Sequence, residues 1–520
     1  MEVTSDKMGT PAPGSEPMRV YGLVLSCLGG FYYFIAWSDR LLSFGGDSAG
    51  YLLMARHYLQ RDPGGVARHF TDHSQYPPLF PLLLGLAGGG SDLLAAHLLT
   101  ATFFILALAV FVLWQRDLGT RGRYALLVAT VFALSPGTYF EAVYIHSEGL
   151  FLVLTLVILV VYRRSEQDKG CLVWLLPVLV ACLSLTRAVG VAMIVAYAAC
   201  TLRELNGRRL ARVALAGAPF VLWTISHSYE SDYLHTFFSR LEAGDLSAAA
   251  GGMFTNVVAA ATQWHLYFFR SHPHLPVFNQ VEVLLSLSTG LAALCGLFVR
   301  LFRWKLDALF ALFYLAIILV WPFPAEMSRF LLPVVPIALA YVVWFSSWIV
   351  ARVAVRPDHQ LAGLAAAAVC IIVVAPGLAR NAARYLVPLP KEVARYKRSP
   401  RWYVSDPGEA FANIESDAVF YRTTRNIGDF IDENECVYSI KPSVVTYLSG
   451  RLSRRPELRN GGLTEKCHYV LLLAYSSPSF PSMYPLAVLR ANGHVLNAVM
   501  VNRVGGKDSD RIVSILATWK

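Results

Sequence analysis

The chain has 520 residues, of which 55% are hydrophobic and only 15% charged, and its mean hydropathy is +0.47. A soluble protein of this length does not need so much apolar surface, and apolar runs of about 18 or more residues, long enough to cross a bilayer core of about 30 Å, recur along the chain. The net charge of +10 comes from short Lys and Arg clusters between apolar segments, a pattern that predicts the cytoplasmic loops of a polytopic membrane protein and excludes a nucleic-acid partner.

With the basic clusters taken as cytoplasmic, the sequence predicts about 11 transmembrane helices within a membrane domain over 18–377. Residues 1–17 are polar and rich in Gly and Pro, and we expect a disordered cytoplasmic N-terminus followed by an uncleaved first helix. An odd number of helices places the C-terminal segment on the outer side. The predicted spans are 18–37, 92–114, 123–140, 144–162, 171–186, 188–202, 210–227, 279–301, 306–321, 329–348 and 361–377.

The first outer loop carries an acidic residue directly after the first apolar segment. The stretch GGDSAGYLLMARHYLQ places Asp47 before an expected helix over 48–60. A second stretch, YPPLFPLLLGLAGG, is too short to span, and its paired prolines suit a helix start, where a missing N–H costs nothing. We expect this second helix over 77–89, and both helices in the membrane interface. The simpler alternative for Asp47 is that it only caps the helix that follows.

On this topology, polar side chains gather at the outer membrane boundary. Glu148 begins one apolar segment, and Arg187 and Arg329 lie in two short turns on the same side. The long outer loop 228–278 holds His265 and Arg270. Together these residues predict one site, open to the outer side and to the outer lipid leaflet. The alternative is that the two arginines only anchor helix ends at lipid headgroups.

From about residue 378 onward, charged and turn residues become more frequent. The segments CVYSIKPSVVTYLSG, CHYVLLLAYSS, AVMVNRV and RIVSILATW are rich in β-branched and aromatic residues and predict strands, and VFYRTTRNIGDFIDEN predicts a helix. We therefore expect a small soluble α/β domain over 378–520, on the outer face. Its only cysteines are Cys436 and Cys467, which are either joined by a disulfide or buried as free thiols in neighbouring strands.

The sequence contains no cofactor-binding motif that we recognise. It has no GK[ST] phosphate loop, and its glycine-rich stretches lack the strand–turn–helix context of a nucleotide fingerprint. Its histidines form no compact zinc-ligand pattern. We expect no cofactor, although a divalent ion held by Asp47 and a second carboxylate would need few protein ligands.

Four stretches occur in a telling order around the hydrophobic helices: GGDSAGYLLMARHYL, YPPLFPLLLGL, SLTRAVGVAMI and SRFLLPVVPIAL. In this order they resemble the C-type (GT-C) membrane glycosyltransferase superfamily, and most of all the branch of protein O-mannosyltransferases and lipid A aminoarabinose transferases. The resemblance implies a GT-C-like fold with two interfacial helices in the first outer loop. The chain departs from the pattern at Ser48, where many relatives have a second acidic residue, and at Gln75–Tyr76, where aminoarabinose transferases have a lysine.

The resemblance implies an inverting transferase that moves a sugar from a polyprenyl-phosphate donor to a hydroxyl of a glycan, lipid or protein acceptor, with Asp47 as the general base. A lipid phosphate leaves as a stable anion, so one base suffices, and the leaving oxygens need nearby positive charge or hydrogen-bond donors. The candidates for contacting the phosphate are Arg187, Arg329, Arg270 and His265. The candidates for the substrate site are Tyr51, Tyr76 and Glu148.

Two other functions compete with this interpretation. A transporter or lipid flippase of similar topology would show broken helices and charged residues at mid-membrane, and such charges are nearly absent here. A non-catalytic assembly subunit would keep the fold and use its tail for binding. We expect an integral protein of a bacterial inner membrane, with the active site on the outer face.

Overall fold

The structure is a computed structural model of the chain. It describes residues 18–38, 46–59, 65–72, 76–166, 170–202, 206–226, 246–269, 276–321, 324–353, 424–439, 441–454, 458–459, 462–463, 467–473, 496–504 and 511–519. The chain divides into two compact units. The helical unit comprises Met1–Phe34, Ala101–Ala142 and Ser147–Arg380, and the mixed unit comprises Ile35–Thr100, Val143–His146 and Asn381–Lys520. The expected N-terminus 1–17 and the expected span 361–377 lie outside the described residues.

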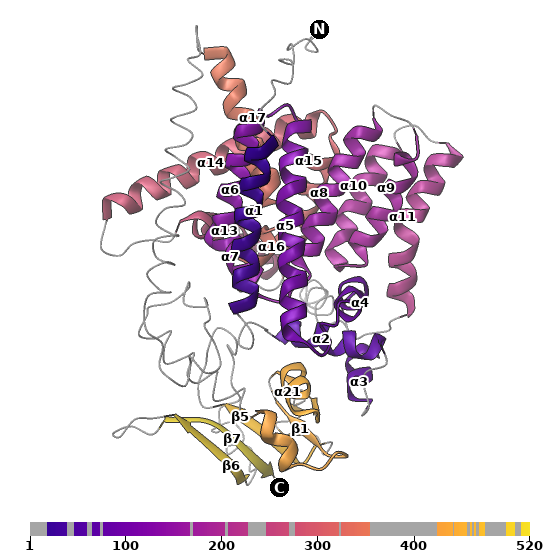
Figure 1. Cartoon of the computed structure of the whole chain (residues 1–520), viewed down its shortest axis with the longest axis vertical. Coiled ribbons are helices and arrows are strands. Elements are labelled where there is room, and N and C mark those ends of the chain that lie inside the picture. The colour runs from indigo at the N-terminus through magenta and orange to yellow at the C-terminus, as the bar shows by residue number, and fades with distance from the viewer. Residues whose placement is uncertain are drawn as a thin grey trace. The chain divides into compact units, whose positions relative to one another are not determined.

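The helical unit is built from apolar helices that follow one another along the chain (Figure 1). Nine of the predicted spans that fall on described residues coincide with one or two of these helices, and the tenth, 188–202, coincides with α10 and the 3-10 turn before it. The helices are α1 Met18–Ser38, α5 Leu93–Asp117, α6 Gly122–Leu134, α7 Pro136–Val143, α8 Glu148–Ser165, α9 Leu172–Ser184, α10 Val191–Thr201, α11 Gly207–Ser226, α13 Leu246–Phe268, α14 Pro276–Phe302, α15 Leu306–Leu319, α16 Met327–Leu331 and α17 Val335–Val353. The end of α1 and the start of α5 belong to the mixed unit.

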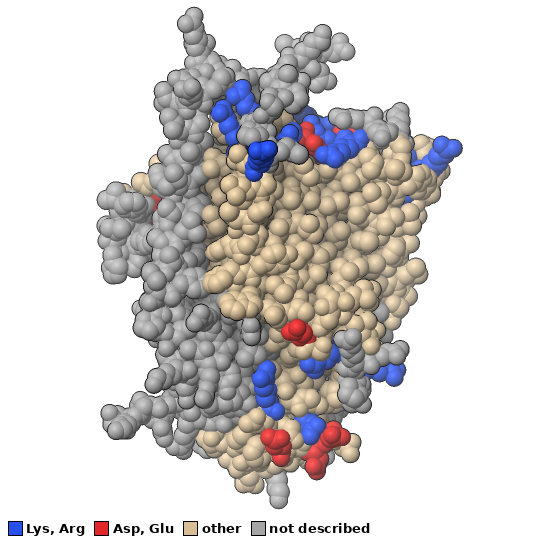
Figure 2. Space-filling model, in the orientation of Figure 1, with Lys and Arg blue, Asp and Glu red and all other residues tan. Residues whose placement is uncertain are grey.

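Several helices have the length and the surface of membrane-spanning segments. Three described helices are long and apolar enough to cross a bilayer, over Arg19–Trp37, Leu93–Asp117 and Gln280–Phe302. Large apolar side chains such as Leu284 and Leu287 are exposed on α14, which marks a surface that contacts lipid. Figure 2 shows a face of the helical unit that is almost free of charge, with Lys and Arg side chains gathered at one end. The chain is therefore an integral membrane protein, and the total of about 11 spans stays a prediction.

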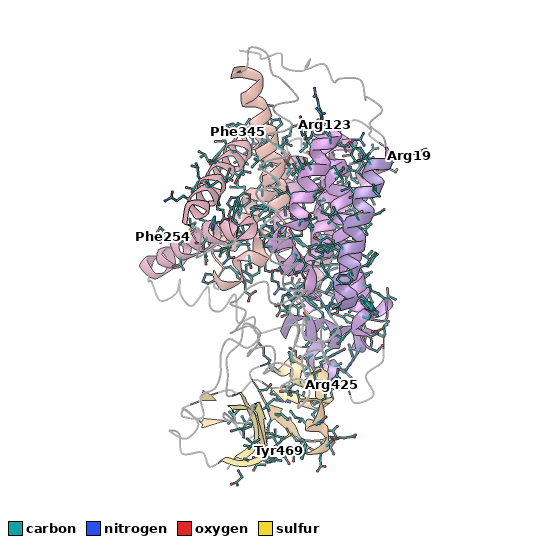
Figure 3. The ribbon with its side chains drawn as sticks, turned by 60° about the vertical axis from the view of Figure 1, so that its left-hand side comes forward. Arg19, Arg123, Phe254, Phe345, Arg425 and Tyr469 are labelled. Carbon is teal, nitrogen blue, oxygen red and sulfur yellow. A yellow bond between two sulfur atoms is a disulfide. The ribbon has the colours of Figure 1, made fainter. Side chains whose placement is uncertain are left out.

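Arg19 and Arg123, which flank two of the apolar helices, lie toward the same end of the helical unit (Figure 3). Both residues belong to segments that the positive-inside rule assigns to the cytoplasm. Their position toward the same end of the helical unit agrees with that assignment. The side of the membrane itself stays a prediction.

Two predicted spans are interrupted at prolines. The segment 123–140 consists of α6 and α7, which meet at Ser135 because Pro136 cannot continue the hydrogen-bond pattern of α6. The segment 329–348 consists of α16 and α17, with Pro333 between them.

The loop 228–278 was expected to be a long loop, and this expectation was wrong for its middle part, which forms the 23-residue helix α13. The segment also contains several polar residues. One of them, Asn256, is satisfied inside the helical unit, because its Nδ2 donates to the carbonyl oxygens of Leu319 at 2.8 Å and Trp321 at 2.6 Å.

In the mixed unit, the segment between α1 and α5 forms three short helices: α2 Gly46–Tyr58, α3 Val66–Asp72 and α4 Leu79–Leu86. The helices expected over 48–60 and 77–89 are thus found within a few residues, whereas α3 was not expected. α4 packs closely on α2, because a Cβ atom at Gly85 would lie only 3.1 Å from the carbonyl oxygen of Ala55. The glycine-rich stretch GLAGGG therefore serves close packing between helices.

The C-terminal part of the mixed unit contains a five-stranded sheet in the order β2-β1-β5-β7-β6. β1 is parallel to β2 and β5, whereas β7 is antiparallel to β5 and β6. A helix, α21 Pro442–Ser449, follows β1 and packs against α2 and the short 3-10 helix η4 Asn426–Asp429. The strands are β1 Cys436–Tyr438, β2 Leu452–Arg454, β5 Tyr469–Leu473, β6 Leu496–Val504 and β7 Arg511–Trp519, with a separate pair β3 Leu458–Arg459 and β4 Gly462–Leu463.

The expected strand over 436–450 was wrong in its second half, which forms α21. Pro442 suits the first turn of a helix, and Gly450 ends it with a positive φ of 69°, so local chain chemistry outweighs the β-branched composition. Of the expected helix over 419–434, the described part is helical only up to Asp429. Cys436 and Cys467 are joined by a disulfide, with their Cα atoms 4.9 Å apart, which decides between the two alternatives left open by the sequence.

Candidate functional site

Asp47 lies in the first turn of α2, half-buried, a short distance along the chain from the first apolar helix. The hydroxyl of Tyr76 donates a hydrogen bond to Asp47 Oδ1 at 2.7 Å. The two residues are 29 positions apart, and both lie in the segment between α1 and α5. The hydrogen bond therefore fixes the orientation of this carboxylate relative to α2.

Tyr76 is held in this position by packing against one glycine of α2 and beside two aromatic rings. Gly50 lies one turn after Asp47, and a Cβ atom there would come within 3.3 Å of the Tyr76 ring. The ring of Tyr51, which is buried, lies 4.7 Å from that of Tyr76 and 5.0 Å from that of Phe80, between ring centroids. α2 and the start of α4 thus form an aromatic support for the Tyr76 hydroxyl.

A second polar group occurs in the helical unit, at the start of α8. Glu148 is fully buried in the first turn of this helix, where the helix dipole favours a negative charge. Arg187, just before the 3-10 turn Ala188–Gly190, and Arg329, in α16, both form ion pairs with Oε1 of Glu148. Their side chains are only 14% and 11% exposed. One buried carboxylate thus holds two arginines from distant parts of the chain.

Glu141, in α7, adds a second acidic group to this cluster. Its carboxylate lies within 4.8 Å of that of Glu148, and it is itself buried. Two carboxylates at this spacing are the kind of pair that binds a divalent cation. Arg187 and Arg329 also bring two positive charges to Glu148. The sequence did not single out Glu141 as a site residue, because nothing in its local pattern distinguishes it from a boundary residue.

The two remaining candidates for contacting the phosphate are His265 and Arg270. His265 lies in α13, and its ring stacks on that of Phe269 at 5.7 Å between centroids. Arg270 lies outside the described residues. Within the described chain, the structure therefore groups Asp47 with Tyr51 and Tyr76 in the mixed unit, and Glu148 with Arg187 and Arg329 in the helical unit.

No protein-family model and no curated protein matches the chain. Among solved structures, ArnT from Cupriavidus metallidurans in the apo state is 12% identical, with a TM-score of 0.49, over 96% of this chain and 98% of that chain. The Archaeoglobus fulgidus oligosaccharyltransferase in complex with Zn and sulfate is 14% identical, with a TM-score of 0.46, over 86% of this chain and 67% of that chain. The protein O-mannosyltransferase Pmt1-Pmt2 complex of S. cerevisiae, bound to the sugar donor, is 16% identical, with a TM-score of 0.29, over 39% and 33%. All three TM-scores lie below 0.5.

Proposed function

We propose that the chain is an inverting glycosyltransferase that moves a sugar from a polyprenyl-phosphate donor to a hydroxyl acceptor at the outer face of the membrane. The observation that carries the proposal is the hydrogen bond from Tyr76 to Asp47 at the start of α2. It holds one carboxylate in a defined orientation in the loop that follows the first apolar helix. A lipid-anchored donor and a water-exposed acceptor would meet at such a position.

The proposed reaction needs one proton transfer and one displacement. Asp47 accepts the proton of the acceptor hydroxyl as the acceptor oxygen attacks the anomeric carbon of the sugar. The bond between that carbon and the phosphate oxygen breaks, and polyprenyl phosphate leaves with the bonding electrons. A single displacement from the opposite face inverts the anomeric configuration. Because the phosphate is stable as an anion, the reaction requires no general acid.

The leaving phosphate gains negative charge in the transition state, so nearby hydrogen-bond donors that carry positive charge accelerate the reaction. We assign this role to Arg187 and Arg329. Their shared ion pair with Glu148 supports the assignment, because the carboxylate holds two guanidinium groups together and limits their side-chain motion. Guanidinium groups match the geometry of phosphate oxygens and remain charged at every physiological pH.

The remaining parts of the proposal concern the setting of the reaction. The C-terminal domain over 378–520 would lie on the outer face of a bacterial inner membrane, where its disulfide between Cys436 and Cys467 would be stable. Tyr51 and Tyr76 would line the sugar site. The acceptor would be a glycan, a lipid or a protein that offers a hydroxyl group.

The proposal is tested with the purified full-length chain in lipid vesicles. The vesicles contain a panel of polyprenyl-phosphate sugars labelled in both the sugar and the lipid, and an envelope extract supplies the acceptor. We expect one donor to release polyprenyl phosphate while its sugar label passes to the acceptor fraction, with the anomeric configuration inverted. Asp47→Asn should abolish both changes, and Asp92→Asn, which keeps the cap of α5, serves as the matched control.

The same vesicles distinguish the competing function. A transporter or flippase would move the intact labelled donor across the bilayer without separating its sugar from its lipid. If the intact donor changes leaflet in the wild type while no polyprenyl phosphate is released from any member of the panel, the transferase assignment is wrong.

A further inference from the structure

A cleft in the mixed unit lies away from Asp47 and plays no part in the proposed reaction. It has a volume of about 420 Å³, within the range of about 300–1,000 Å³ that is usual for small-molecule sites. Its walls come from α2, from the turn before α5 and the first residues of α5, from Arg425 just before η4, and from α21. The polar residues among its walls are Arg56, Ser91, Asp92, Arg425 and Tyr447.

Arg56 is held in a fixed position at this cleft. Its Nε donates to the carbonyl oxygen of Gly90 at 2.6 Å, and its guanidinium lies 4.1 Å from the centroid of the Tyr447 ring. The backbone at Gly90 lies close to α2, and a Cβ atom at this position would come within 3.1 Å of the backbone nitrogen of Arg56. An arginine has five N–H donors, and an arginine held in this way loses little side-chain freedom when it binds a ligand.

The charges around the cleft favour an anion. Arg425, labelled in Figure 3, is exposed and adds a second guanidinium group. Burial raises the pKa of the Tyr447 phenol, Arg56 and Arg425 oppose that rise, and Asp92 adds to it. The phenol therefore keeps its proton at neutral pH, and both guanidinium groups lie close enough to interact with it electrostatically.

Asp92 is the one acidic residue among the residues that line the cleft, and it has a separate structural task. Its Oδ1 accepts a hydrogen bond from the backbone N–H of Leu94 at 2.8 Å, which caps the start of α5. With two arginines against one aspartate, the lining carries a net positive charge.

We propose that this cleft binds a phosphate group through Arg56 and Arg425. A phosphate group carries a charge of about −1.5 to −2 at neutral pH, which the two guanidinium groups match, and its oxygens accept the paired donors of arginine. The site is distinct from Asp47, because Arg56 follows it by nine residues, or about 13 Å along the axis of α2. The phosphate comes either from a lipid headgroup or from a soluble phosphate compound, and the experiment separates these two sources.

The test measures how fast phenylglyoxal modifies individual arginines in the full-length chain, mapped by peptide mass spectrometry. One arm adds inorganic phosphate to the protein in nanodiscs of neutral phosphatidylcholine, with potassium chloride of equal ionic strength as the reference. The other arm replaces part of the neutral lipid with phosphatidic acid and adds no phosphate. Arg68, an exposed arginine on α3 outside the cleft, is the internal control in each digest.

We expect the modification of Arg56 and Arg425 to slow relative to Arg68 in at least one arm. Slowing by inorganic phosphate identifies a soluble source, and slowing by phosphatidic acid alone identifies a headgroup. Arg425→Gln should weaken the protection of Arg56 about tenfold, as expected for the loss of one charge-assisted hydrogen bond. Asp92→Asn should strengthen it, because Asn still caps α5 but removes the opposing charge.

Two results would overturn the proposal. The first is that neither arm slows Arg56 or Arg425 in the wild-type chain, or that Arg68 slows equally. The second is that Arg425→Gln, with unchanged elution on size exclusion, leaves the protection of Arg56 as it was. The wild-type measurement decides the question even if a variant fails to fold.

Discussion

The helical unit contains two buried clusters of arginine and carboxylate that have opposite designs. In the first, Arg300 pairs with Asp307 through both its Nε and a terminal nitrogen, at 2.7 and 2.8 Å, and the Tyr341 hydroxyl adds a third bond at 2.7 Å. The partners are seven residues apart and join the end of α14 to the start of α15. In the second, Glu148 receives Arg187 and Arg329 on a single oxygen, from 39 and 181 residues away.

The different geometries of the two clusters indicate different roles. The first matches one guanidinium to one carboxylate in the parallel two-bond geometry that is strongest, so it closes a turn and has no excess charge. The second places two guanidinium groups on one carboxylate, and a second buried carboxylate, that of Glu141, lies within 4.8 Å of the first. The first cluster stabilises the fold, whereas we propose that the arginines of the second contact the donor phosphate.

Breaking the first cluster should cost the most stability. Asp307→Asn leaves Arg300 buried opposite a neutral group, and the loss of one partner of a buried pair costs about 3–5 kcal/mol. Thermal unfolding of the detergent-solubilised protein should show a clear drop in apparent Tm. The double variant Arg300→Met with Asp307→Leu should recover most of it, because no charge remains buried. Transfer activity per folded molecule should stay unchanged, and a selective loss of activity would assign Asp307 to the reaction.

The second cluster should respond in the opposite way. Arg187→Ala or Arg329→Ala leaves Glu148 with one arginine, so the loss of stability should be smaller than for Asp307→Asn. The rate of transfer should fall about 10- to 100-fold, since a hydrogen bond to a charged group is worth about 1.5–3 kcal/mol. Kinetics with the lipid donor should show a raised KM and a lowered kcat. Unchanged kinetics in both variants would place the phosphate site elsewhere.

Tyr76 and Tyr341 each donate one hydrogen bond to an aspartate, and removing either hydroxyl group compares a proposed catalytic carboxylate with a structural one. Tyr76→Phe removes the bond to Asp47, and transfer should fall about tenfold with little change in Tm. Tyr341→Phe removes the bond to Asp307, and Tm should fall while transfer per folded molecule stays the same. The contrast fails if both variants lose stability and neither loses activity, because Asp47 would then be a structural residue like Asp307.

The smallest expected effect comes from adding one methyl group, by replacing either Gly50 or Gly22 with alanine. Alanine in place of glycine inside a helix stabilises it by about 0.5–1 kcal/mol, so Gly22→Ala should raise Tm slightly, and Gly50→Ala should raise it less because of the contact with Tyr76. A Cβ at position 22 meets nothing within 4 Å, whereas one at position 50 presses on the Tyr76 ring. Transfer should therefore fall a few-fold in Gly50→Ala only. Equal activity in the two variants would show that the position of Tyr76 is not critical.

Local sequence was enough to predict most of the apolar helices and the position of Asp47 at the start of α2, but not α3, α13 or α21. The apolar runs and the paired prolines are strong local signals, so α2 and α4 were found close to their expected bounds. The error at α21 arose because Val444, Val445 and Tyr447 favour a strand by composition, whereas Pro442 and Gly450 set the ends of a helix. The prediction of a strand relied on composition and overlooked the residues that set the ends of a helix.

Contacts between distant residues were beyond the reach of one sequence. Arg187 and Arg329 were singled out by their place at the membrane boundary, but nothing in the sequence could show that Glu148 holds both. Arg56 and Tyr447 are 391 positions apart, so their contact depends on the docking of α21 against α2. Such pairings are fixed by tertiary packing, and a single sequence carries no trace of them.

The central claim is that Asp47 is the base of a glycosyl transfer, and a single-turnover rate tests it most directly. Enzyme saturated with labelled polyprenyl-phosphate sugar is mixed with acceptor, and the first turnover is followed for the wild type and for Asp47→Asn. The account predicts unchanged donor binding and a rate lower by about 10²–10⁴-fold, the usual contribution of a general base. An Asp47→Asn enzyme that keeps a tenth or more of the wild-type rate would contradict it.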